Sequence, residues 1–212
     1  MRVPATLLGV AASLALVQPV AAQIAVGTSV GMFVPLGGWH HVEGGQPIER
    51  RNMPAAIFGG RVDYWLSERF GLEGVLALTP SQVAISDPAQ TQDVTAGVFA
   101  ASVVGLAKVL SIGYGGNHRG HNEWDIYVGA GGAIMSRFGT AWEGWTGTTH
   151  PAGILALIST SPIGRSVNLR FGFEDFISKA RFKNAGLTTE TNASLRHELV
   201  VTLGFMVRMG GR

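Results

Sequence analysis

The 212-residue sequence contains no cysteine, only three lysines and few charged residues of either sign. Without cysteine, a disulfide scaffold and a cysteine-ligated metal site are excluded. Asp, Glu, Lys and Arg make up 14% of the chain, whereas a soluble domain usually carries about 25%. The net charge of +2 does not supply the concentrated basic face that nucleic-acid binding requires. After residue 22 there is no apolar run of 18 or more residues, so a membrane-spanning helix is excluded there.

The first 22 residues have the three-part pattern of an export signal. Arg2 gives a positive start, an apolar stretch follows, and Val20-Ala21-Ala22 places small residues where a signal peptidase reads them. The alternative, a membrane anchor, is less favoured because Pro4 and Pro19 interrupt the stretch. The pattern predicts a signal peptide over residues 1–22, cleavage after Ala22, and a single domain over residues 23–212.

From residue 23 onward, apolar residues recur with a period of two, as they do in strands. Thirty glycines disfavour long helices, because each glycine inside a helix costs about 1 kcal/mol relative to alanine. Six strands have a clear alternation, and they cover residues 24–36, 58–66, 70–78, 124–137, 167–174 and 196–208. Two further apolar runs, 94–109 and 153–159, are predicted strands whose faces the pattern does not assign. The sequence therefore predicts an all-β fold with eight strands.

The two faces of these strands differ in side-chain size and in charge. One face carries leucine, isoleucine, valine and phenylalanine, and the other mixes glycine and alanine with charged residues. The charged residues on the second face are Arg61, Asp63, Glu73, Asp125, Arg137, Arg170, Glu174, Glu198 and Arg208. The interior of an eight-stranded barrel has room for side chains only, so the small-residue face fits inside.

An apolar exterior distinguishes a membrane barrel from a soluble one. An arginine that faces lipid near the bilayer midplane costs about 2–4 kcal/mol, whereas inside the barrel the arginines can pair with the acids. We therefore expect an antiparallel up-and-down transmembrane β-barrel whose lumen is lined by the nine charged residues. A soluble lipocalin-like carrier, with the two faces exchanged, is the alternative.

The predicted connections alternate between short and long. Residues 67–69 and 161–166 are short links, and residues 37–52, 80–92, 139–151 and 177–195 are long ones. Outer-membrane barrels have short periplasmic turns and long extracellular loops, and this alternation fits them. The glycine-rich link 111–123 is the exception, since it is a long connection at the end where the short periplasmic turns are expected.

With these features, the chain resembles the small eight-stranded outer-membrane barrels of the OmpA transmembrane-domain, OmpX and OmpW type. The hairpin over residues 61–73 is the most family-like stretch. The last strand is similar to the signal read by the outer-membrane assembly machinery, with Thr202, Gly204, Val207 and Met209 at the matching spacing. It departs from that signal by ending in Gly210-Gly211-Arg212 and not in an aromatic residue. The resemblance implies an outer-membrane location, with membrane lipid, lipopolysaccharide and the assembly machinery as partners.

Some barrels of this type act on lipid A, and the sequence has six histidines that such chemistry could use. The lipid A deacylase type uses a His-x-Ser pair, and the sequence contains none. His118 and His121 have the spacing of metal ligands, but a zinc site needs three or four ligands, so a solvated turn is the preferred interpretation. His40, His41 and His150 have no assigned partners. The sequence predicts no catalytic residue, no metal site and no cofactor.

Two functional hypotheses follow. In the first, the barrel is a structural or interaction protein of the cell envelope with a filled lumen, and Trp39, Trp142 and Trp145 lie in loops that could contact partners. In the second, it is a conduit for small molecules or a lipid A-modifying enzyme. A continuous charge network across the lumen would favour the first hypothesis, and a hydrophobic opening in the side of the barrel would favour the second.

Overall fold

The computed structural model describes residues 23–43, 46–86, 91–113, 123–184, 189–191 and 194–209. Its elements in chain order are β1 (Gln23–Leu36), β2 (Trp39–Glu43), β3 (Gln46–Asn52), β4 (Ala55–Trp65), β5 (Phe70–Ser86), β6 (Thr91–Gly113), β7 (Glu123–Phe138), the 3-10 turn η1 (Thr140–Trp142), β8 (Trp145–Thr146), β9 (Thr149–Pro162), β10 (Val167–Ala180), β11 (Lys183–Asn184), β12 (Thr189–Glu190) and β13 (Ser194–Met209). Residues 1–22 lie outside the described residues, so the signal peptide and the cleavage after Ala22 stay predictions. Within the described residues, no helix is long and apolar enough to cross a membrane.

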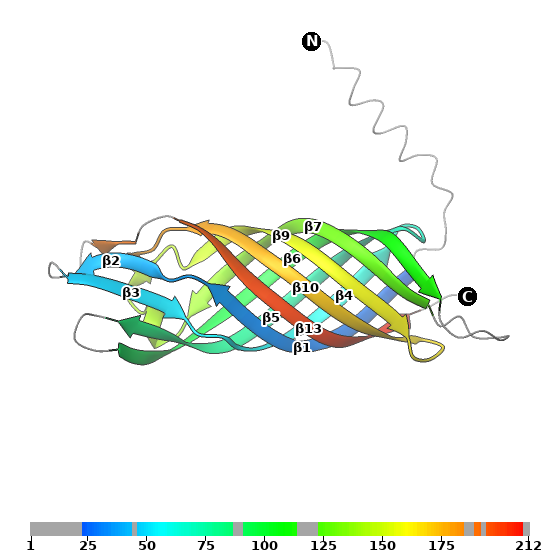
Figure 1. Ribbon diagram of the computed structural model, residues 1–212, viewed down its shortest axis with the longest axis horizontal. Coiled ribbons are helices and arrows are strands. Elements are labelled where there is room, and N and C mark those ends of the chain that lie inside the picture. The colour runs from blue at the N-terminus through cyan, green and yellow to red at the C-terminus, as the bar shows by residue number, and fades with distance from the viewer. Residues whose placement is uncertain are drawn as a thin grey trace, which may run out of the picture.

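Eight long strands form a closed antiparallel ring. Each pairs with the next in the order β1, β4, β5, β6, β7, β9, β10 and β13. The ring closes because β13 pairs with β1, in a register that runs from Ile24 opposite Met209 to Leu36 opposite His197. Figure 1 shows these strands winding obliquely around one long axis. The predicted eight-stranded barrel is confirmed, and closure leaves none of these strands with an unpaired edge in the membrane.

The apolar face of the strands is on the outside of the barrel. Leu76 on β5 and Val103 on β6 are each 59% exposed, while Glu73 and Arg170 are 1% exposed. The same alternation holds on every strand with an assigned face. A soluble carrier would have the opposite arrangement, so the lipocalin-like alternative is wrong.

The structure assigns the inward and outward faces of the two strands that the sequence pattern left unassigned, β6 and β9. On β6, Val98, Val104 and Leu106 are buried, and Phe99 is exposed. On β9, alternate aliphatic residues are likewise buried and exposed. Both faces of these strands are apolar, because this side of the lumen is filled by aliphatic side chains.

Strands continue well beyond the predicted loop boundaries at one end. Residues 80–92 were expected to form a loop, but β5 runs to Ser86 and β6 starts at Thr91. Residues 37–52 contain the hairpin β2–β3, whose second strand pairs with β5. Beyond the membrane the outer face of a strand no longer contacts lipid, so its residues need not be apolar. The alternating pattern therefore ends there, although the strands continue to pair through their backbones.

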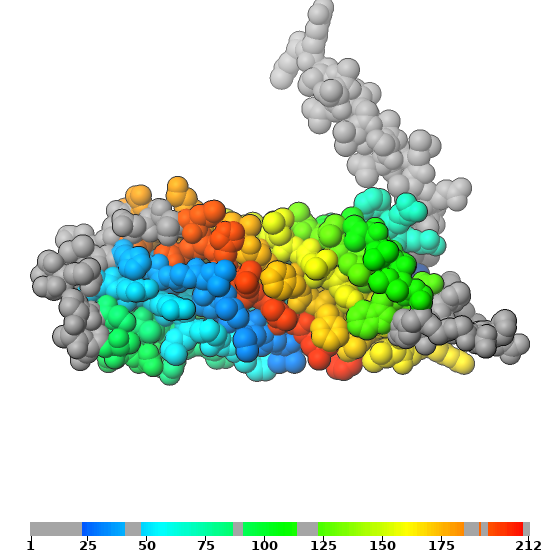
Figure 2. All heavy atoms as spheres, viewed as in Figure 1, coloured from blue at the N-terminus to red at the C-terminus, as the bar shows by residue number. Residues whose placement is uncertain are grey.

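The two ends of the barrel differ accordingly. We call the end with the turns at residues 66–69 and 163–166 the turn end, and the end with the β2–β3 hairpin the cap end. Figure 2 shows the blue and cyan atoms of the hairpin segments toward one end of the elongated molecule, and the yellow atoms around the β9–β10 turn toward the other. The short strands β8, β11 and β12 form a separate small sheet.

Candidate functional site: a filled lumen with two groups of ion pairs

Four buried side chains form the ion cluster of the lumen: Arg61, Glu73, Arg170 and Glu174. Arg61 Nη1 lies 3.0 Å from Glu73 Oε1 and 2.8 Å from Glu174 Oε1. Arg170 Nη2 lies 2.8 Å from Glu73 Oε1 and 3.5 Å from Glu174 Oε1. Each arginine thus contacts both glutamates, which is the arrangement in which buried charge is tolerated.

Small neighbours leave room for the ion cluster. Arg61 is opposite Gly27 on β1, and Arg170 is opposite Gly204 on β13. A Cβ atom on Gly172 would lie 2.7 Å from Arg170 Nη1 and 3.3 Å from Glu174 Oε1. Gly172 was not among the predicted site residues. Its position on the inward face of β10, between Arg170 and Glu174, was the sequence feature that could have identified it.

A second ion pair lies nearer the cap end. Arg137 Nη2 on β7 is 2.6 Å from Glu198 Oε1 on β13, and both side chains are buried. The Arg137 guanidinium also lies 4.8 Å from the centroid of the Trp39 ring. Arg196 lies 4.4 Å from the same ring and donates a hydrogen bond to the Gly38 carbonyl oxygen.

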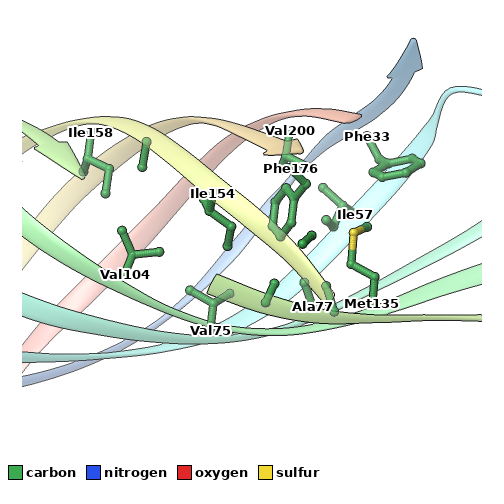
Figure 3. Close-up of a cluster of buried hydrophobic side chains, with 14 of the residues drawn as sticks. Phe33, Ile57, Val75, Ala77, Val104, Met135, Ile154, Ile158, Phe176 and Val200 are labelled. Atoms are coloured by element: carbon green, nitrogen blue, oxygen red, sulfur yellow. The ribbon is translucent and has the colours of Figure 1, made fainter. Parts of the chain in front are cut away.

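Apolar side chains separate the two groups of charges. On the inner face of β13, Val200 stands between Glu198 and Thr202. The apolar block comprises Phe33, Ile57, Val75, Ala77, Val98, Ala100, Val104, Leu106, Tyr127, Ala133, Met135, Ala152, Ile154, Ala156, Ile158, Phe176 and Val200. Figure 3 shows its members pointing into the barrel from several strands. The predicted lumen of glycine, alanine and charged groups is therefore wrong in part, since a large aliphatic and aromatic block fills much of it.

The cap end carries its own apolar core, the aromatic cap, formed by Trp39, Trp142, Trp145 and Phe182. The Phe182 ring lies 4.8 Å from Trp142 and 5.2 Å from Trp39, between ring centroids. Val83, Ala96, Ala141 and Ala180 complete this core. The expectation that the three tryptophans contact partners from loops is wrong, because all three are buried against one another and the strand ends.

Two of the nine predicted lumen residues lie at the turn end, outside the buried clusters. Asp125 is half-buried and accepts hydrogen bonds from Lys108 Nζ at 2.9 Å and from Tyr127 Oη at 3.2 Å. Arg208 is exposed, and its Nη2 lies 3.2 Å from the Asn168 side-chain oxygen. Asp63, another of the nine residues, is buried inside the barrel.

The histidines occupy unrelated positions. His150 is buried with its ring centroid 5.8 Å from that of Phe182, and His40 is exposed on β2. His197 Nδ1 lies 2.8 Å from Asp175 Oδ2 on the exterior face. His41 lies on β2, and His118 and His121 lie outside the described residues. In the part of the chain that the structure describes, no three His, Cys, Asp or Glu side chains are grouped to hold a metal ion.

The residues of the predicted assembly signal are divided between the two faces of β13. Thr202 and Gly204 are buried inside, whereas Val207 and Met209 are exposed on the lipid side. Recognition of these residues by the assembly machinery stays a prediction.

Comparison with solved structures shows the fold. OprG from Pseudomonas aeruginosa, an outer membrane protein, superimposes with a TM-score of 0.67 at 12% identity, over 90% of this chain and 97% of OprG. The outer membrane protein AlkL gives 0.54 at 13% identity, over 89% and 92%. Neisserial surface protein A gives 0.50 at 8% identity, over 89% and 99%. No family model and no curated protein matches the chain. With its apolar exterior, the chain has the fold of the small outer-membrane β-barrels.

Proposed function

We propose that the protein is a closed, non-conducting and non-catalytic outer-membrane barrel that presents a folded cap at the cell surface in a structural or interaction role. One observation carries this proposal: side chains fill the lumen between its turn end and the cap. The apolar block packs beside the ion cluster and continues beyond it, and the Arg137–Glu198 pair and the aromatic cap follow toward the cap end. An axial route for a solute would require several of these layers to move together.

The cap supports a surface role for the outer end. It is built on the same strands as the barrel, because β5 and β6 continue beyond the apolar band and β3 pairs with β5. Its own core of tryptophans holds the short strands and the hairpin in place. A rigid surface of this kind suits contact with an envelope partner better than separate mobile loops would.

Electrical recording tests the closed lumen. We expect the wild-type protein in a planar bilayer to give no stepwise current, because no water-filled path runs through the barrel. Folding is established on the same preparation by a gel band that migrates faster unboiled than boiled, as a folded barrel does. Reproducible single-channel steps from protein that passes this control would replace the proposal with the conduit alternative.

Lipopolysaccharide is the proposed partner at the membrane surface. Lys179, Arg181 and Lys183 alternate with buried residues and are all exposed, just beyond the lipid-facing Ile177. Cations at the rim of the outer leaflet are positioned for the phosphates of lipid A, and each basic residue near an anionic surface contributes about 1 kcal/mol.

Replacing these three residues by glutamine should weaken binding of the detergent-solubilised protein to lipid A by about tenfold to a hundredfold. Binding would be measured by surface plasmon resonance on immobilised lipid A. Arg165→Gln, which removes an exposed charge from the β9–β10 turn at the other end, should bind like the wild type. Equal binding by the triple variant and Arg165→Gln would rule out these cations as the contact.

A further inference from the structure

The turn end of the barrel opens into a polar hollow of about 350 Å³, which we call the vestibule. Its wall includes Asp63, Trp65, Lys108, Asp125 and Tyr127, with the exposed Arg208 also in the lining. Lys108 on β6 and Asp125 on the neighbouring strand β7 form an ion pair in this wall at 2.9 Å, so the charges of these two residues compensate each other.

Asp63 adds a third carboxyl group at the inner part of the vestibule. It is directly opposite Glu73 in the pairing of β4 with β5, and both side chains face inward and are buried. Two carboxylates placed opposite each other repel. Among the buried side chains that the structure describes here, the carboxyl groups of Asp63, Glu73 and Glu174 thus outnumber the guanidinium groups of Arg61 and Arg170.

The carboxylate atoms confirm that acceptor capacity is left over. Asp63 Oδ1 and Glu73 Oε2 are buried, and no donor in the described part of the chain hydrogen-bonds to them. Asp63 is 5% exposed and lines the vestibule. A buried, unpartnered acceptor costs free energy, and a cationic donor entering from the vestibule would satisfy it.

Two aromatic rings stand beside this acceptor. The centroids of Trp65 and Tyr127 are 5.0 Å apart, and the Trp65 ring lies over Gly71, where a Cβ atom would be 2.7 Å from the indole. The Lys108 ammonium already lies 5.8 Å from the Tyr127 centroid. Aromatic faces attract alkylammonium groups, whereas a metal ion would require further oxygen or nitrogen ligands.

We propose that the vestibule is a binding site for a small organic amine in its ammonium form. The ammonium group binds the Asp63 carboxylate, and its alkyl part packs on Trp65 and Tyr127. This site goes beyond the proposed function, because a closed barrel requires no ligand at its turn end.

Titration calorimetry with n-butylammonium chloride tests the site on the folded protein in a nonionic detergent. We expect saturable binding by the wild type and at least tenfold weaker binding by Asp63→Asn, which removes the charge but keeps the size. Trp65→Leu should weaken binding about threefold to tenfold. Asp93→Asn, at an exposed position at the far end of β6, is the matched control and should bind like the wild type.

Two reference ligands distinguish the contribution of the positive charge from that of the alkyl group. Potassium chloride at the same ionic strength and n-butanol should each give no saturable heat, because one lacks an alkyl group and the other lacks a charge. Equal binding of potassium, or unaltered binding by Asp63→Asn, overturns the proposal, as does a wild type that does not bind the amine. If Asp63→Asn fails to give the folded gel band, Trp65→Leu and the two reference ligands decide the question.

Discussion

Replacing Leu76 by arginine is expected to prevent assembly of the barrel in a membrane. Leu76 faces outward on β5 and is 59% exposed. Its neighbours on the adjacent strands are Gly60 and Ala101, which offer no side-chain partner for a guanidinium. An arginine there would face lipid, at a cost of up to about 2–4 kcal/mol. Because the free energy of folding of a small domain is only about 5–15 kcal/mol, this loss should strongly reduce the folded population.

The measurement is refolding into lipid vesicles, with the folded fraction read from the unboiled gel band. Leu76→Phe is the matched control, since it keeps an apolar side chain at the same position and should fold like the wild type. If Leu76→Arg folded to the same extent as Leu76→Phe, the outward facing of β5 would be wrong.

Removing Arg170 should produce the second large effect, a loss of about 3–5 kcal/mol in the free energy of unfolding. Arg170 is 1% exposed and contacts both glutamates of the ion cluster. In Arg170→Leu, Glu73 and Glu174 would have only Arg61 as a cationic partner. Buried carboxylates without a counter-charge are strongly destabilising.

Urea unfolding in vesicles, followed by tryptophan fluorescence, measures this loss. Arg165→Leu, in the exposed turn just before the same strand, should change the midpoint little. The double variant Arg170→Leu/Glu73→Leu should recover much of the stability, because an ion pair replaced by apolar residues of similar size is often neutral. A single variant as stable as Arg165→Leu would show that water, and not Arg170, compensates the glutamates.

The strands that alternation predicts well are those whose inner face is polar or small. On β4, the inward Arg61 and Asp63 alternate with the outward Val62 and Tyr64, so a period of two separates lumen from lipid. On β9 the inward Ile154 and the outward Leu155 are equally apolar. Hydrophobicity alone then cannot distinguish the faces, because lipid and a packed lumen select the same side chains.

The partners inside the lumen depend on register, which composition does not specify. Sequence alternation places Arg61, Glu73, Arg170 and Glu174 inside, but their mutual contacts arise because β4, β5 and β10 bring them to the same height. Similarly, Asp125 and Arg208 have the inward parity yet lie at the open end, because depth along the axis is set by strand tilt and not by the period.

The aromatic cap could not be predicted for a different reason. Outside the membrane, neither lipid nor a narrow lumen imposes an alternating pattern, so the loop segments carry only short strand signals. Trp39 and Phe182 come from segments far apart in the sequence, and their contact exists only once the ring has formed. The tryptophans therefore gave the impression of exposed binding residues when they are core residues.

The pairing of β1 with β13 has a consequence for biogenesis. The strand nearest the start of the described chain completes the sheet only with the strand nearest its end, so every partly formed sheet has two unpaired edges. Such edges are templates for pairing with another chain, and contacts between distant segments form slowly. Until β1 and β13 pair, a nascent copy can therefore pair its exposed strand edges with those of a neighbouring copy. A chaperone that handles this topology has to shield both edges until the ring closes.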